Sequence, residues 1–140
     1  MSLGDHLRYL RAMHGGIDTA TIAEAIGLEK PGPINQAEVR YHPVYDAELI
    51  ERLAAYYGRP RDEFEWHNAR PRKFLTFTIA QALETGEEVS LTLRTGEVLA
   101  GTAEWWDLAS VGLRTTDGHL LVVQRHAVID WPGATEWEDA

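Results

Sequence analysis

The sequence predicts an α+β protein in which an all-α N-terminal domain precedes a small antiparallel β-barrel. Apolar residues at helical spacing, interrupted by glycine stops, divide residues 1–68 into short helices. Short β-rich runs then alternate with turn dipeptides between residues 91 and 131. The 140 residues suffice for two small domains of this kind.

The N-terminal half is expected to contain four helices. The first has an apolar stripe and ends at Gly15-Gly16, and Asp18 is expected to cap the second. The third is expected over residues 32–40, with a proline in its first turn, and the fourth over residues 46–57. Two short helices joined by a glycine turn are a candidate helix-turn-helix.

Three segments of this half, LGDHLRYLRAMHG, IDTATIAEAIGL and DAELIERLAAYYGRPRDEF, resemble the N-terminal module of the lambda-repressor-like (XRE) transcription regulators. The resemblance implies a helix-turn-helix domain, which we place at residues 1–68, whose third helix contacts DNA. Asparagine, glutamine, lysine and arginine reach base edges or phosphates, and the candidates of these types are Lys30, Asn35, Gln36 and Arg40. The alternative is a solvated helix face on a module that serves protein contacts.

The C-terminal half shows the alternation of a half-buried sheet. Val89, Leu91 and Leu93 alternate with polar residues, and Gly101 falls within a strand, where a missing side chain permits a bend or a close backbone approach. Turn dipeptides at residues 95–96 and 117–118 separate the runs. Five such strands are expected to close as a barrel.

The segments RTGEVLAGTAEWWDLASVGLR and VVQRHAVIDW resemble the two signature blocks of the bacterial Sm-like RNA chaperone Hfq, and FLTFTIAQAL resembles the helix that opens that fold. The resemblance implies a five-stranded Sm/SH3-like barrel with a leading helix, placed at residues 72–132, followed by an acidic tail over 133–140. It also implies that outer strands of neighbouring copies pair into a closed homo-oligomer, such as a hexameric ring, which leaves no exposed sheet edge.

By the same resemblance, RNA would be bound by Gln124, Arg125 and His126, with Asp107 in the loop after the second strand. Arg125 would meet phosphate and His126 would contact a base. The alternative is that Arg125 and His126 bridge strands or subunits and have no ligand.

Charge is unevenly distributed along the chain. Residues 1–73 carry 10 Lys+Arg against 11 Asp+Glu, whereas residues 74–140 carry 3 against 11, so nearly all of the net −9 lies in the second half. An acidic barrel repels phosphate backbones unless its cations are concentrated in one place. The charge total therefore favours protein contacts, whereas the two resemblances favour nucleic acid.

Several classes of protein are not expected. The chain has no cysteine, no nucleophile-elbow serine, no glycine-rich phosphate loop and no HExxH spacing, so neither catalysis, nor a metal site, nor a cofactor is predicted. No run is long enough to span a membrane, and no signal segment is recognisable, so a cytoplasmic protein is expected. The prediction is a nucleic-acid-binding regulator acting on DNA, RNA or both; the alternative is an oligomeric protein-interaction scaffold.

Overall fold

The structure is a computed structural model that describes residues 1–138. It has the predicted α+β class, with helices first and then a helix followed by a five-stranded antiparallel sheet. The chain divides into two compact units, one of residues 2–71 and the other of the residues from 72 onward together with Met1. We call these the helical unit and the sheet unit. Residues 139–140 of the expected acidic tail lie outside the described residues.

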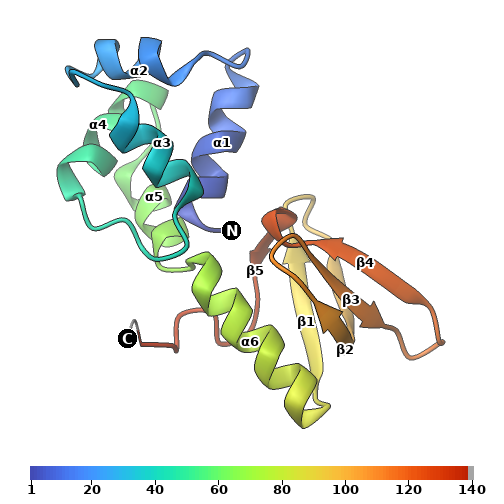
Figure 1. The fold of residues 1–140 in the computed structure, drawn as a ribbon. Coiled ribbons are helices and arrows are strands. Elements are labelled where there is room, and N and C mark those ends of the chain that lie inside the picture. Colours follow the sequence, from blue (N-terminus) through green and yellow to red (C-terminus); the bar gives the residue numbers. More distant parts are fainter. Residues whose placement is uncertain (139–140) are drawn as a thin grey trace. The chain divides into compact units, whose positions relative to one another are not determined.

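The helical unit contains α1 (Leu3–Met13), α2 (Thr19–Ala25), α3 (Gly32–Val39), α4 (Ala47–Tyr57) and α5 (Arg61–Asn68) (Figure 1). The first four lie where the sequence predicts helices. The fifth was not predicted, because half of its residues are charged, it buries only Phe64 and His67, and it follows a proline, so the pattern resembles a turn. Phe64 is nonetheless fully buried in the core of the unit.

Capping side chains explain where the helices begin. Asp18 is the N-cap of α2, as predicted, and its Oδ1 accepts a hydrogen bond of 2.8 Å from the backbone N–H of Thr21. Asp46 caps α4 in the same way, with a bond of 3.0 Å from the N–H of Leu49. Each carboxylate satisfies a backbone donor that the first helical turn leaves unpaired. At the other end of α4, Gly58 adopts the left-handed conformation with φ of 65°.

α1 and α3 approach each other closely at Gly4. A Cβ atom at this position would lie 2.6 Å from the carbonyl oxygen of Ala37 and 2.7 Å from that of Glu38. The buried Glu38 carboxylate accepts two hydrogen bonds from Arg11, 2.9 Å from Nε and 2.8 Å from Nη2. This paired contact fixes α3 against α1 and stabilises a charge that would be costly to bury alone.

A second polar contact joins α5 to α1. His6 Nε2 lies 3.1 Å from Glu63 Oε2, and the His6 ring stacks on that of His67 with centroids 3.9 Å apart. The pKa of Glu63 is lowered to about 2, because the Arg59 guanidinium hydrogen-bonds its carboxylate and His6 adds a further bond. Glu63 is thereby kept charged at the junction of the two helices.

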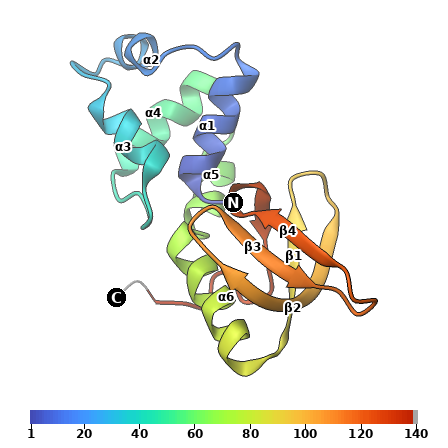
Figure 2. The ribbon, with the colours of Figure 1, turned by 45° about the vertical axis from the view of Figure 1, so that its right-hand side comes forward.

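The sheet unit consists of α6 (Arg72–Thr85) followed by β1 (Glu88–Leu93), β2 (Val98–Trp106), β3 (Ser110–Arg114), β4 (Leu120–Gln124), the 3-10 turn η1 (Arg125–Ala127) and β5 (Val128–Asp130). The strand order is β4-β3-β2-β1-β5, and every pairing is antiparallel. α6 packs on β1 and β2 and runs along the curved sheet (Figure 2). Its Phe74, Leu75 and Ile79 are buried in the core of the unit.

The prediction of a closed barrel was wrong, because no backbone hydrogen-bond ladder joins the two edge strands of the sheet. The five strands form an open sheet, in which β4 pairs with β3 and β5 pairs with β1. The short turn η1 carries the chain from one edge of the sheet to the other. There β5, only three residues long, pairs with β1 and not with β4. Within residues 1–138, β4 and β5 are therefore the two edges of the sheet.

Gly101 has the role that its position in the sequence predicts. It lies opposite Val89 in the β1–β2 ladder, and a Cβ atom there would be 2.7 Å from the carbonyl oxygen of Arg114 on β3. The close approach is to backbone, which has little freedom to move away. The two strands can therefore approach this closely only because the residue has no side chain.

The segment after β5 packs against α6. Trp131 is buried, and its indole Nε1 donates to Thr78 Oγ1 at 3.1 Å; Trp137 donates to the same oxygen at 3.0 Å. Both indole rings therefore attach the segment after β5 to α6. Among the described helices, none combines the length and apolar character needed to cross a membrane.

Replacing Gly101 with alanine should destabilise the sheet unit by about 1–3 kcal/mol, because the added methyl group would collide with the Arg114 carbonyl group. Thermal unfolding followed by circular dichroism measures the loss. Thr102→Ala, on the exposed side of the same strand, is the matched control, and its thermal stability should stay close to that of the unsubstituted chain. A Gly101→Ala variant as stable as the control would contradict the close approach.

Candidate nucleic-acid interface

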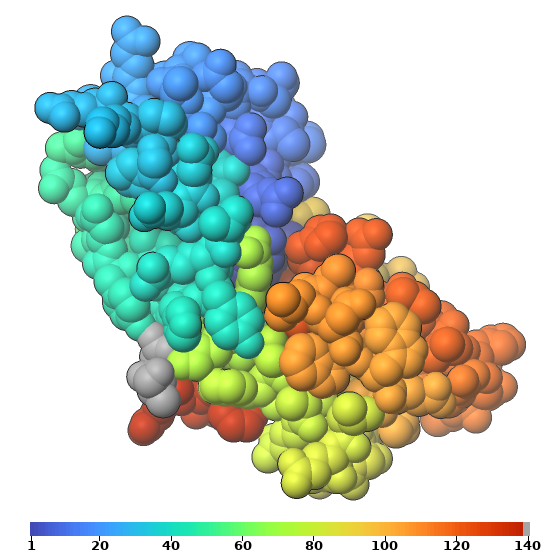
Figure 3. Space-filling model, in the orientation of Figure 1, coloured from blue at the N-terminus to red at the C-terminus, as the bar shows by residue number. Residues whose placement is uncertain are grey.

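α3 presents one face to the core of the helical unit and another to the outside. Ile34, Ala37 and Glu38 are buried, whereas Asn35, Gln36 and Arg40 are exposed. Gln36 and Arg40 are four positions apart and so lie one turn from each other along the same side. In the space-filling view the segment around α3, coloured cyan, forms part of the visible surface of its unit (Figure 3). The structure thus brings two of the predicted DNA-binding residues together.

The other two predicted DNA-binding residues lie differently. Asn35 Oδ1 accepts a hydrogen bond of 2.7 Å from the Thr19 hydroxyl, so its side chain is tied to the start of α2. Lys30 is exposed in the turn that precedes α3. The Asn35 side chain is therefore partly committed within the protein, whereas that of Lys30 is exposed to solvent.

The Arg40 side chain is oriented by two neighbours. Its Nε donates to the carbonyl oxygen of Pro43 at 2.6 Å, and the guanidinium carbon lies 5.4 Å from the centre of the Tyr45 ring. These contacts restrict the rotamers of a long side chain and so reduce the entropy lost on binding. Tyr45 was not among the predicted site residues, because only the turn at residues 40–46 brings its ring near the end of α3.

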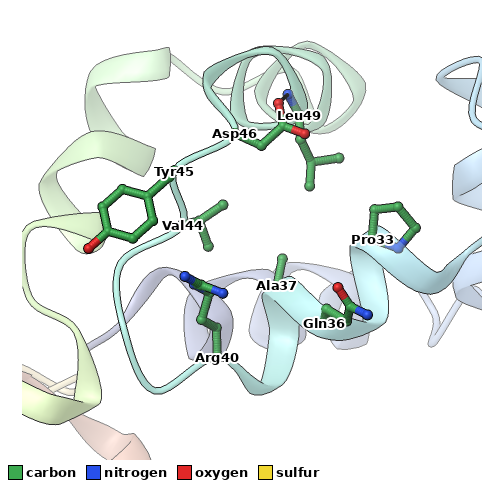
Figure 4. A pocket seen from close by; sticks show the side chains of 8 residues that line it. All are labelled: Pro33, Gln36, Ala37, Arg40, Val44, Tyr45, Asp46 and Leu49. Atoms are coloured by element: carbon green, nitrogen blue, oxygen red, sulfur yellow. Dashed lines mark hydrogen bonds between the residues drawn. The ribbon is translucent and has the colours of Figure 1, made fainter.

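Beside Arg40 the helical unit is hollowed. A cavity of about 220 Å³ lies between α3 and the start of α4, and Figure 4 shows Gln36 and Arg40 on one side of it and Asp46 on the other. Residues 44–46 border it, and the Asn68 side chain holds the backbone of Val44 in place. The Asn68 amide accepts from the N–H of Val44 and donates to its carbonyl oxygen, both at 2.8 Å.

In the sheet unit, Arg125 is buried. Its guanidinium donates to the carbonyl oxygen of Asp107 at 2.7 Å, to that of Arg72 at 3.3 Å and to the Thr76 hydroxyl. The Trp106 ring lies 5.6 Å from its guanidinium carbon. The side chain thus connects α6 with the loop after β2, and these contacts favour the interpretation in which Arg125 bridges elements of the unit.

The three other predicted RNA-binding residues are exposed, but they do not form one cluster of donors. The Asp107 carboxylate accepts the backbone N–H groups of Ala109 at 2.8 Å and Ser110 at 2.7 Å, which organises its own turn. Asp107 and Arg125 meet through the Asp107 carbonyl group and not through its carboxylate. Gln124 at the end of β4 and His126 in η1 remain the outward-facing polar residues of this region.

Within residues 1–138, no group of three or more histidine, aspartate or glutamate side chains is arranged to hold a metal ion.

Arg125→Met should destabilise the sheet unit by about 2 kcal/mol or more, because two partly buried carbonyl groups and a buried hydroxyl would lose their charged donor. His126→Ala, at the adjacent exposed position, should change stability by no more than about 0.5 kcal/mol. Urea unfolding of both variants measures the difference. Equal stabilities would show that the buried guanidinium has no structural role and would restore Arg125 as a ligand contact.

No protein-family model matches the chain, and no curated protein matches it.

Proposed function

We propose that this chain is a nucleic-acid-binding regulator in which the helical unit contacts DNA and the sheet unit assembles several copies. The observation that carries the proposal is the exposed side of α3. There Gln36 and Arg40 lie one turn apart, on a helix fixed from behind by Gly4 and the Arg11–Glu38 pair. Glutamine pairs with adenine in the major groove, and arginine binds guanine or phosphate. The resemblance to the XRE module supports the same assignment.

Charge supports DNA at the helical unit over RNA at the sheet unit. In the sheet unit the Arg125 guanidinium is buried, and Arg114 is paired with Glu104 through bonds of 2.8 Å and 3.0 Å. Few cations of this acidic half therefore remain to neutralise a phosphate backbone. RNA contact would rest on Gln124 and His126 alone, without the basic residue that the Sm-like resemblance assigns to it.

The sheet unit supports assembly through its edges. β4 and β5 lie at opposite ends of the strand order, so β4 of one copy can pair with β5 of the next. The outward face of β4 carries the exposed apolar residues Leu120 and Val122. An apolar edge strand without lysine or proline is a template for pairing. A homo-oligomeric ring of the Sm type, such as a hexamer, is the arrangement that this supports.

The acidic charge of the sheet unit favours a second candidate function, an oligomeric scaffold that binds protein partners and no nucleic acid. In that case α3 would be a solvated or partner-facing helix. The two candidates share the assembly and differ in whether DNA binds at low salt.

Gln36→Ala with Arg40→Ala should weaken binding to sequences selected from a randomised double-stranded DNA pool by at least tenfold, since each good base contact contributes about 1–3 kcal/mol. The DNA affinity of the unsubstituted chain should fall steeply as salt rises. The logarithm of the association constant should decrease linearly with the logarithm of the salt concentration, with a slope of about 0.9 per phosphate neutralised. Arg61→Ala on α5, whose partners are Glu51 and Glu65, is the control. Absence of DNA binding at low salt would favour the scaffold.

Val122→Lys should reduce the molar mass in solution measured by light scattering, because a charge on the outward face of β4 opposes packing at that edge. Leu83→Lys, which places the same charge at an exposed apolar position on α6, should leave the assembly intact. A monomeric unsubstituted chain would refute the ring, and an unchanged Val122→Lys assembly would refute pairing through β4.

A further inference from the structure

Half of the residues that line the hollow beside α3 are apolar. Pro33 and Ala37 of α3, Val44 of the connecting turn and Leu49 of α4 line it (Figure 4). Its volume of about 220 Å³ is below the range of about 300–1,000 Å³ typical of sites for drug-sized ligands. The size therefore suits a small metabolite with an aliphatic part.

The polar groups of the hollow carry both signs of charge. Gln36 and Arg40 supply donors from α3, and Asp46 supplies a carboxylate from the start of α4 on the other side (Figure 4). A ligand with one charge would meet a like charge on one of these sides. A ligand with one positive and one negative group matches both.

These charged groups are held in place before any ligand arrives. Arg40 uses Nε for its bond to Pro43, so this bond does not occupy the terminal nitrogens Nη1 and Nη2. Asp46 uses Oδ1 to cap α4, so the cap does not occupy Oδ2. Asn68 fixes the backbone of Val44 between them. Fixed donors and acceptors lower the ordering cost of binding.

We propose that this hollow binds a free α-amino acid with an aliphatic side chain. The carboxylate of the ligand is held by Arg40 and Gln36, its ammonium group faces Asp46, and its side chain covers Val44 and Leu49. Binding of the amino acid does not depend on the proposed function. Its effect on regulation does rest on that function: Gln36 and Arg40 also belong to the proposed DNA-binding surface, so an amino acid in the hollow would compete with DNA.

L-leucine is the probe, titrated into the full chain and followed by isothermal calorimetry and NMR. We expect a dissociation constant of about 1 mM or tighter. Two analogues test the charges: isoamylamine lacks the carboxylate, and 4-methylpentanoate lacks the ammonium group. Each should bind at least tenfold more weakly, because each leaves one charged group of the hollow without a partner. No binding of L-leucine, or equal binding of all three compounds, would overturn the proposal.

Substitutions of residues that line the hollow test whether L-leucine binds there. Arg40→Gln and Asp46→Asn should each weaken L-leucine binding at least tenfold, and asparagine remains a good N-cap, so α4 should be preserved. Arg61→Gln, outside the hollow, is the control and should bind as the unsubstituted chain does. If both hollow variants retain helical circular dichroism and bind L-leucine normally, the site is refuted.

The DNA assay separates this proposal from the proposed function. L-leucine binding by a chain that binds no DNA would support the amino-acid site and refute the DNA-binding function. DNA binding without any L-leucine binding would support the DNA-binding function and refute the amino-acid site. If both bind, saturating L-leucine should lower DNA affinity, and unchanged affinity would refute the competition.

Discussion

The buried Glu38 carboxylate and its two hydrogen bonds from Arg11 are the contact on which the candidate site depends. A carboxylate can be buried at the inner face of α3 only if a cation meets it there. Gly4 allows the backbone at the end of α3 to approach α1 closely enough for that pairing. With its inner face fixed in this way, α3 holds Gln36 and Arg40 outward and forms one wall of the hollow.

The sheet unit depends on a buried charge in a comparable way. The Arg125 guanidinium connects α6, the loop at Asp107 and the Trp106 ring. The use of Arg125 inside the unit removes a cation from a half that is already acidic. The proposed function therefore gives nucleic-acid contact to the helical unit and assembly to the sheet unit. This division accounts for the charge asymmetry, which a single ligand spread over both units would not.

Much of the fold follows from local sequence patterns. Asp18 caps α2 through a bond to Thr21, three residues away, and Gly96 and Gly118 have the positive φ values that the predicted turns require. Gly101 marks a close backbone approach, as a glycine within a strand predicts. The exposed side of α3 was also predictable, because helical spacing places Gln36 and Arg40 on one side. All of these features depend on residues within a few positions of each other or on a single missing side chain.

The sequence by itself therefore determined the α+β class, the first four helices and the outward residues of α3. Only the tertiary structure decided that α5 forms, that the sheet stays open, that Arg125 is buried and that Tyr45 and Asp46 border a hollow with Arg40. Arg125 reaches acceptors on α6 about fifty positions earlier in the chain, and α5 is held by burial of Phe64 and by the contact of His6 with Glu63. Such contacts depend on which elements meet in space, and the period of a sequence pattern contains no information about that.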